Sequence, residues 1–286
     1  GWRAILDLKR LNKNLVYRKF KMNTLQSILL SIREGDFLTS IDLTEAYLHI
    51  PIRPHHSKYL RFCYDGHHFE YTALPFGLSS APRVFTKILA ALAAHLRDKP
   101  VRIHCYLDDI LLLARSSSQA KLDTKFTLQT LQDLGFSINW AKSQLSPSNR
   151  IQHLGAVIDT VKGQVFLSSD RKESIRNLAQ HIRTTKRAKL ADLSKLLGKL
   201  ISSISIIPWA RLHARPLQWF LLPFQRAGRS NSTTRVCVPP KVLISLHWWT
   251  THNINKGCPL KEPHRLTITT DASLFGWGAH FRSMTA

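Results

Sequence analysis

The stretch Val101-Arg102-Ile103-His104-Cys105-Tyr106-Leu107-Asp108-Asp109-Ile110-Leu111-Leu112-Leu113-Ala114 places apolar runs on either side of two adjacent acids. Runs of this length and β-forming composition predict the two strands of a hairpin, with Asp108-Asp109 at the turn. Aspartate is common at tight turns, so a purely structural turn is the simplest explanation of this stretch taken alone. The stretch therefore predicts a β-hairpin and leaves the role of its acids open.

A third acid, Asp42, follows another apolar run, 37–41, which predicts a core strand with an acid near its C-terminal end. Nucleotidyl transfer needs two divalent ions about 3.5–4 Å apart, held by at least two converging carboxylates. Mg²⁺ prefers such oxygen ligands and keeps waters for the remaining positions. We therefore expect Asp42, Asp108 and Asp109 to be the catalytic acids that hold two Mg²⁺ ions, with Mn²⁺ as a possible substitute.

The segments around these strands predict an α+β fold. Expected elements are a hairpin at 59–73 around Asp65-Gly66, helices at 81–96 and 117–134, and a strand pair at 136–140 and 153–159. This order is typical of a layer in which helices cover one face of an antiparallel sheet and leave the other face open. The open face can hold a substrate.

The chain is strongly basic, with 41 Lys and Arg against 18 Asp and Glu and a net charge of +23. Such a surplus predicts a polyanionic partner, and nucleic acid is the first candidate. A ribosomal-type or membrane-surface protein is the alternative, but those usually carry basic tails or amphipathic arms. Here hydrophobic residues make up 44% of 286 residues, enough for a sizeable core in two or three subdomains. A folded enzyme fits better.

From Asp170 onward the pattern becomes helical and basic. Asp170 and Glu173 resemble a capping box, and a 3.6-residue apolar period then predicts two helices. Their polar faces carry Arg171, Lys172, Arg176, Arg183, Lys186, Arg187, Lys189, Lys195 and Lys199. Residues 223–263, rich in Pro, Ser, Arg and Trp, indicate a connector, and a new strand is expected from Leu266.

The four cysteines lie far apart, without a Cys-x-x-Cys pair, and indicate reduced thiols of an intracellular protein, cytoplasmic or nuclear. No apolar run is long enough for a membrane span, so we expect no membrane partner. A start at Gly1 and an end within a strand pattern indicate a segment of a longer polypeptide.

Tyr106-Leu107-Asp108-Asp109 resembles the Tyr-x-Asp-Asp box of reverse transcriptases. The family's other boxes are matched in order and at the expected distances by 2–13, 41–47, 74–82, 134–136, Lys142 and 153–155. Any one of these would be weak, but together they are specific, and the resemblance covers the whole chain. It is closest to polymerases of long-terminal-repeat and DIRS-type retrotransposons, and the stretch 137–155 suggests the latter.

The resemblance implies a right-hand polymerase fold, with fingers, a palm built on an antiparallel sheet, and a helical thumb. The implied domains are fingers and palm at 1–160, thumb at 161–222, connection at 223–263, and the truncated start of a ribonuclease H-like domain at 264–286. The implied activity is RNA-directed DNA synthesis, which extends a primer 3′-hydroxyl with dNTPs. Its partners would be an RNA template, the primer-template duplex and dNTPs; the sequence does not fix the oligomeric state.

The resemblance also assigns roles residue by residue. Asp42 and Asp108 are implied to be direct metal ligands, assisted by the Leu43 carbonyl, with Asp109 as the weaker third acid. Nucleotide-binding positions are implied at Arg3, Glu45, Ala46, Tyr47, Phe76, Gly77 and Lys142. The primer grip is implied at His153, Leu154 and Gly155. Asp271 resembles the first metal acid of ribonuclease H, whose other acids are absent, so the chain is not expected to cleave RNA.

Two alternatives stay open. An RNA-dependent RNA polymerase shares the sheet and the Asp-Asp turn, but a small or polar residue would be expected in place of Tyr47. A catalytically inactive retroelement remnant would still bind nucleic acid through its basic surface, although three intact acids argue against decay at the site.

Overall fold

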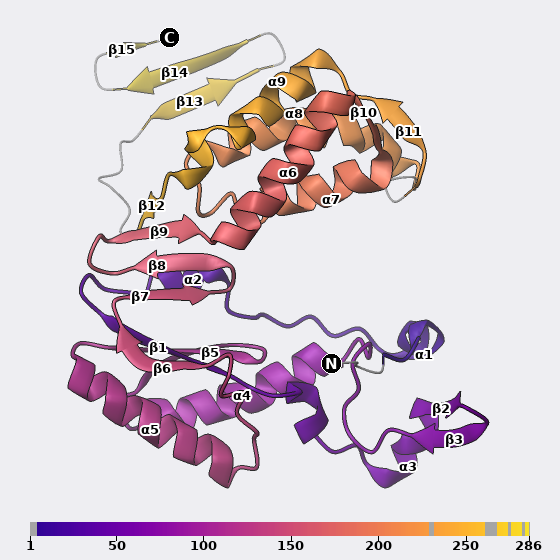
Figure 1. Cartoon of the computed structure of the whole chain (residues 1–286), viewed down its shortest axis with the longest axis vertical. Coiled ribbons are helices and arrows are strands. Elements are labelled where there is room, and N and C mark those ends of the chain that lie inside the picture. Colours follow the sequence, from indigo (N-terminus) through magenta and orange to yellow (C-terminus); the bar gives the residue numbers. More distant parts are fainter. Residues whose placement is uncertain (1–4, 229–231, 261–267, 274–275, 282–283, 286) are drawn as a thin grey trace.

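Two four-stranded antiparallel sheets and a bundle of helices make up most of the chain (Figure 1). The computed structural model describes residues 5–228, 232–260, 268–273, 276–281 and 284–285. The fold is mixed α+β, as the sequence predicted.

The main sheet has the strand order β4-β5-β1-β6. Its strands are β1 (Phe37–Asp42), β4 (Arg102–Tyr106), β5 (Asp109–Ala114) and β6 (Gln144–Ser148). Helices α4 (Ala81–Arg97) and α5 (Ser117–Asp133) cover one face of this sheet, as expected (Figure 1). β5 is apolar and almost entirely buried, because it lies between two strands and under a helix.

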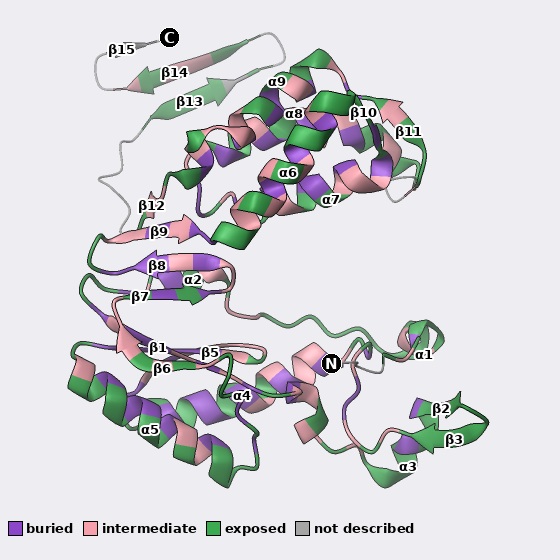
Figure 2. Cartoon of the chain, viewed as in Figure 1, coloured by how far each residue is buried: buried purple, intermediate pink, exposed green. Residues whose placement is uncertain are grey.

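The predicted hairpin at 59–73 is confirmed. Strands β2 (Arg61–Tyr64) and β3 (His67–Glu70) pair across Asp65 and Gly66, both of which have positive φ. Two-residue hairpin turns require such angles, and Asp-Gly adopts them readily. The hairpin stands away from the main sheet, and its residues are mostly exposed (Figure 2).

The strand expected at 136–140 is not formed, and its expected pairing with 153–159 is wrong. Ile138 makes a single bridge, to Leu43, after which the backbone turns at Asn139. That turn is closed by the amides of Lys142 and Ser143, which donate to the Asn139 carbonyl at 3.2 and 3.0 Å. The chain therefore reverses before a strand can extend.

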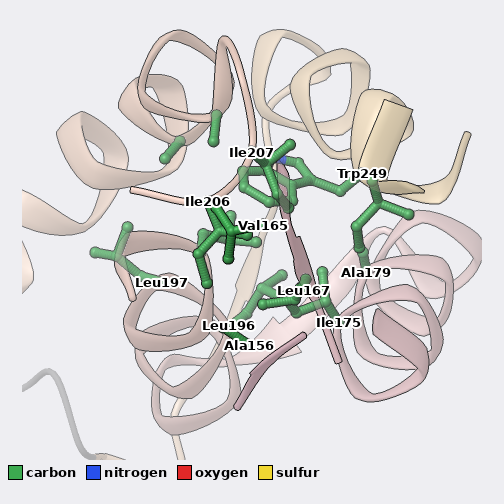
Figure 3. Close-up of a cluster of buried hydrophobic side chains, with 14 of the residues drawn as sticks. Ala156, Val165, Leu167, Ile175, Ala179, Leu196, Leu197, Ile206, Ile207 and Trp249 are labelled. Carbon is green, nitrogen blue, oxygen red and sulfur yellow. The ribbon is translucent and has the colours of Figure 1, made fainter. Parts of the chain in front are cut away.

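The second sheet has the order β12-β9-β8-β7. Its strands are β7 (Arg150–His153), β8 (Ala156–Asp159), β9 (Gln164–Leu167) and β12 (Cys258–Pro259). It packs against a bundle formed by α6 (Ser169–Thr185), α7 (Leu190–Ile201), α8 (Ala210–Arg226) and α9 (Pro240–Thr250). Val165, Ile175, Leu196 and Trp249 converge from the sheet and the bundle on one apolar cluster (Figure 3).

The capping box expected at Asp170 and Glu173 is absent. Ser168 is the N-cap of α6, and Asp170 lies in the first helical turn. Its carboxylate is still well placed there, because the helix dipole favours negative charge at the N-terminus.

Within 223–263, the segment that we expected to form a connector, the described elements α9 (Pro240–Thr250) and β11 (Arg235–Cys237) pack against the helical bundle. α9 contacts α6 and α8, and β11 pairs with β10 (Arg187–Lys189). The Trp249 ring is fully buried, and its Nε1 donates to the His213 carbonyl at 3.0 Å. The Pro and Ser content of the segment indicates loops, but its aromatic and aliphatic side chains complete the core.

The remaining elements are shorter, and the last three strands form a sheet of their own. These elements are α1 (Lys9–Asn14), α2 (Leu25–Leu29), α3 (Pro54–Ser57), the 3₁₀ turns Ala46–His49, Lys58–Leu60 and His252–Asn255, and strands β13 (Thr269–Ala272), β14 (Trp277–Phe281) and β15 (Met284–Thr285). The strand expected from Leu266 is described from Thr269. All four cysteines are free, and no described helix has the length and apolar character of a membrane span.

Asp36, just before β1, is a fully buried carboxylate. Arg102 of β4 binds both of its oxygens, each at 2.9 Å, and the Arg33 amide donates to it at 2.8 Å. Arg115, just after β5, lies 3.7 Å away. The bidentate pair with Arg102 ties the start of β1 to β4, and the longer contact with Arg115 links it to the end of β5.

We predict that Asp36→Asn lowers the free energy of unfolding by about 3 kcal/mol, because the change leaves the partly buried Arg102 guanidinium without its counter-charge. Urea unfolding followed by circular dichroism measures the change. Glu70→Gln is the matched control, since it breaks the exposed Arg61–Glu70 pair and should cost far less. Equal losses in the two variants would contradict the role of Asp36.

Candidate active site

The predicted hairpin brings its acids to the end of the main sheet. Tyr106 pairs with Asp109, so the two turn residues are Leu107 and Asp108 rather than Asp108 and Asp109. Leu107 has a φ of 52°, an angle that bulky residues seldom adopt outside functional sites. Asp108 is exposed at the tip, whereas Asp109 is half-buried as the first residue of β5.

Asp42 joins these acids through the pairing of β1 with β5. In that register Asp42 lies directly opposite Asp109, and the Leu43 amide donates to the Asp108 carbonyl at 3.0 Å. The three acids therefore occupy one end of the sheet, as the sequence predicted.

The site concentrates negative charge. Burial, reinforced by the charges of Asp108 and Asp42, raises the pKa of Asp109 to about 6. Burial also raises the pKa of Asp42, while nearby Lys142 and a hydrogen bond from Asn139 oppose the rise. The folded chain thus holds carboxylates where their ionised forms are disfavoured, which is common at functional sites.

The donor set fits Mg²⁺. The described His, Cys, Asp and Glu side chains form no cluster of three or more that could enclose a metal ion by themselves. Mg²⁺ is usually held by one or two carboxylates and completes its octahedron with water and substrate phosphates, so a closed protein cage is not required. Burial is the main cause of the raised pKa of Asp109, and divalent cations would neutralise the repulsion from Asp108 and Asp42 that adds to it.

The turn 139–143 holds Asp42 from the side opposite Asp109. The Asn139 amide donates to the Asp42 carbonyl at 2.8 Å, and the Asp42 amide donates to the Ser143 hydroxyl at 3.0 Å. That hydroxyl in turn donates to the Asn139 carbonyl at 2.8 Å. Asn139 and Ser143 were not predicted from the sequence, where their proximity to Lys142 was the available signal. Lys142 itself is exposed on this turn, close enough to Asp42 and Asp109 to affect both pKa values.

The expected nucleotide-binding residues gather beside the same acids. The Tyr47 ring lies 5.1 Å from the Phe76 ring and 5.5 Å, edge-on, from the buried Phe85 ring. Burial raises the pKa of Tyr47, and the charge of Asp108 raises it further, which places Tyr47 near the tip of the hairpin. Ala46 is buried next to it, and Glu45 has a left-handed φ of 47°. Arg3 lies outside the described residues.

Gly77 lies in a loop that is held by hydrogen bonds to Asn12, a residue for which the sequence predicted no role. The Asn12 side chain donates to the Gly77 carbonyl at 2.9 Å and accepts from the Ser79 amide at 2.8 Å. Gly77 has a φ of 95°, and a Cβ atom there would lie 2.9 Å from the Leu6 carbonyl oxygen. A glycine is therefore required on both counts.

A hollow of about 290 Å³ joins the acids to the expected primer grip. Asp42, Asp109 and Lys142 line it together with Ser40, Ile41, Gln152, His153, Leu154 and Gly155. His153 is buried, and this burial lowers its pKa to about 4, so its ring is neutral at pH 7. Asp271 is not part of this group, because it lies in β13 of a separate sheet that the picture shows well apart from the main sheet (Figure 1).

Residues 1–158 match the family model described as reverse transcriptase (RNA-dependent DNA polymerase). The chain belongs to the reverse transcriptase family. This match contains all three acids of the sheet end and the Tyr47–Phe76 pair.

Relatives of this reverse transcriptase domain include the transposon Tf2-3 and Tf2-7 polyproteins of Schizosaccharomyces pombe. Each is 26% identical over 243 residues, a region that covers 83% of this chain and 18% of the polyprotein. The chain thus spans less than a fifth of these relatives' length. The relationship to retrotransposon polyproteins confirms the predicted resemblance.

Solved structures share the fold. The foamy viral protease-reverse transcriptase dRH in complex with double-stranded DNA has a TM-score of 0.73 at 20% identity, covering 98% of this chain and 49% of that one. The same viral protein in complex with an RNA/DNA hybrid has a TM-score of 0.72 at 20% identity, covering 94% of this chain and 34% of that one.

The raised pKa of Asp109 predicts a pH-dependent cost in stability. Because the folded-state pKa of about 6 exceeds the unfolded value near 3.9, the folded chain binds this proton more tightly. Stability contributed by that proton is present below about pH 4 and is lost as the pH rises through about 6. Asp109→Asn should therefore raise the free energy of unfolding at pH 7.5 without metal by about 1 kcal/mol, after discounting for solvent screening.

Urea unfolding with EDTA at pH 7.5 and pH 4 measures this difference, which should disappear at pH 4. Added Mg²⁺ should reduce the gain at pH 7.5, because cation binding stabilises the wild-type folded state. A gain that is the same at both pH values would show that Asp109 carries no such cost.

Proposed function

We propose that the chain is the polymerase core of an RNA-directed DNA polymerase, which extends a primer 3′-hydroxyl with dNTPs by two-metal nucleotidyl transfer. One observation carries the proposal: Asp42, Asp108 and Asp109 meet at one end of the main sheet, beside the Tyr47–Phe76 pair. Family membership supports the chemistry. The alternative, an inactive remnant that only binds nucleic acid, predicts no extension.

The carboxylates of Asp42 and Asp108, assisted by the Leu43 carbonyl, would hold two Mg²⁺ ions, with Asp109 as the weaker third acid. Bound there, such ions activate the 3′-hydroxyl and neutralise the triphosphate. Lys142, exposed beside Asp42 and Asp109, would give a proton from Nζ to the pyrophosphate leaving group. The triphosphate would be held by Arg3 and by the backbone amides of Glu45 and Ala46. The nucleotide and the template would rest on the loop that contains Phe76 and Gly77.

In right-hand terms, we assign the fingers and palm to 1–160 and the thumb to the bundle that begins at 161. The packing of α9 against α6 and α8 favours a thumb that extends past residue 222 through Thr250. The rest of the segment 223–263 would be the connection, and 264–286 would begin a ribonuclease H-like domain whose first acid is Asp271.

The partners we propose are an RNA template and the primer-template duplex. No Asp or Glu occurs between Asp192 and Glu262, a stretch that includes Lys195, Lys199, Arg211 and Arg215. Such a basic bundle suits contact with backbone phosphates. Solved structures of the same fold hold double-stranded DNA and an RNA/DNA hybrid.

Asp108→Asn should reduce primer extension by on the order of 10³-fold or more, because a neutral amide cannot replace a metal-binding carboxylate. Its affinity for the primer-template should stay the same, since the basic bundle is unchanged. Primer extension on an RNA template with Mg²⁺, paired with a fluorescence-anisotropy titration of the duplex, measures both. Extension by the variant at the wild-type rate would refute the two-metal assignment, and absence of extension by the wild-type chain would favour the inactive remnant.

Tyr47→Val should raise ribonucleotide use relative to deoxyribonucleotide use by on the order of 10²-fold, or about 3 kcal/mol in transition-state discrimination. The ring, wedged between Phe76 and Phe85, would occupy the volume that a 2′-hydroxyl needs, and valine would vacate it. The measurement is the ratio of kcat/KM for a matched ribo and deoxy pair. Tyr64→Val, on the exposed hairpin, is the control and should leave the ratio unchanged. A uniform fall of both rates in Tyr47→Val would make Tyr47 a packing residue.

A further inference from the structure

The turn between β7 and β8 has a strained backbone. Its two residues, Leu154 and Gly155, both have positive φ, 49° and 73°. Two-residue hairpin turns favour Asn or Gly at such positions, and a leucine there is costly. An outlier of this kind persists only where surrounding contacts hold it, and such outliers concentrate at functional sites.

Arg171, in the first turn of α6, supplies those contacts. Its Nη1 lies 3.4 Å from the Leu154 carbonyl oxygen and 3.5 Å from the Gly155 carbonyl oxygen. Its Nη2 donates to the Ser202 hydroxyl, at the C-cap of α7. One guanidinium therefore bridges the turn, α6 and α7.

The fit around Gly155 is close. A Cβ atom at this position would lie 2.5 Å from Cδ and 2.7 Å from Nη1 of Arg171. The Gly155 carbonyl also accepts from the Ser168 amide, at the N-cap of α6, at 3.1 Å. The turn is thus bound to the beginning of α6 by backbone and side chain together.

The other side of the same turn borders the candidate active site. Leu154 and Gly155 line the hollow that contains Asp42, Asp109 and Lys142. The sequence placed Arg171 among the cations on the polar face of a basic helix. Its side chain is instead half-buried, with its donors directed at protein oxygens.

We propose that Arg171 is a positioning residue that couples the helical bundle to the turn 154–155, so that the position of α6 and α7 sets the position of the turn beside the catalytic acids. The proposal rests on the proposed polymerase function for its consequence in catalysis, while the coupling is a property of the protein alone. It assigns Arg171 a mechanical role in place of contact with nucleic acid.

Lysine at position 171 separates the two roles. An ammonium group keeps the charge and would still bind a phosphate, but it lacks the planar fork that reaches two carbonyls and a hydroxyl together. Arg171→Lys should therefore lower the single-nucleotide incorporation rate of the bound primer by about tenfold, nearly as much as Arg171→Ala, with duplex affinity and its salt dependence unchanged. Rescue by lysine, or a salt slope reduced by about one unit in Arg171→Ala, would assign Arg171 to a phosphate and overturn the proposal.

Lys125→Ala is the matched control, since it removes one positive charge from an exposed position on α5, outside the basic bundle. It should leave the incorporation rate of the saturated complex unchanged. If it lowers that rate as much as Arg171→Ala does, the effect is one of net charge, and the coupling is refuted.

A double-mutant cycle tests the contact itself. In the wild type, Gly155→Ala must displace the Arg171 side chain, whereas in Arg171→Ala that obstacle is gone. If each single change lowers the incorporation rate about tenfold, two independent sites would together lower it roughly hundredfold. The double variant should lose much less than this. Strict additivity would overturn the proposal.

Hydrogen exchange on the full chain without nucleic acid separates this proposal from the polymerase assignment. Arg171→Lys should speed exchange at the Ser168 amide and along the first turn of α6. The reason is that the Ser168 amide donates to the Gly155 carbonyl, whose position the variant no longer holds. This result is expected whether or not the chain extends a primer. Unchanged protection there would refute the coupling, even in a chain whose extension activity is intact.

Discussion

The register in which β1 pairs with β5 is the constraint on which the site depends. It sets Asp42 opposite Asp109, and the hairpin then carries Asp108 to the same end of the sheet. Because side chains alternate between the two faces of a strand, a slip of one residue would turn Asp42 into the layer under α4 and α5 and bring Ile41 to the open face. The apolar side chains of β1 and β5 fix that register through burial. The hydrophobic core and the placement of the acids are therefore a single structural requirement.

The two ends of the main sheet place carboxylates in opposite electrostatic surroundings. At one end, Asp36 is fully buried and satisfied by Arg102, with Arg115 nearby, so its charge ties the start of β1 to the hairpin. At the other end, Asp42 and Asp109 face each other beside Asp108. Burial and mutual repulsion raise the pKa of both, despite the opposing effects of Lys142 on both acids and of Asn139 on Asp42. A binding site for cations needs this imbalance, since carboxylates already paired with arginine would have no free oxygens for a metal. The fold thus gives up stability where it can hold ions, as many enzymes do at their active sites.

The packing also separates the cationic side chains into two groups, those that bind protein oxygens and those that are exposed. Arg102, Arg115 and Arg171 are directed at protein oxygens and join elements that are distant in sequence. Other cations, such as Lys195, lie on exposed helix faces, where phosphates can reach them. Net charge alone cannot make this distinction, because an arginine in an internal bridge and one on a binding surface count equally in the total.

The sequence by itself determined the local elements and the identity of the acids. Hydrophobic periodicity predicted α4, α5 and the β4–β5 hairpin, since each follows from contacts between near neighbours. The strand expected at 136–140 is not formed, because Asn139 reverses the chain. The composition of 223–263 did not reveal that Trp249 lies in the core. Only the tertiary structure showed that Asn12, Asn139, Ser143 and Arg171 support the site, because each acts through a backbone group far away in sequence. Hydrogen bonds to backbone groups leave no periodic pattern, so the residues that position a site emerge only when the chain is folded.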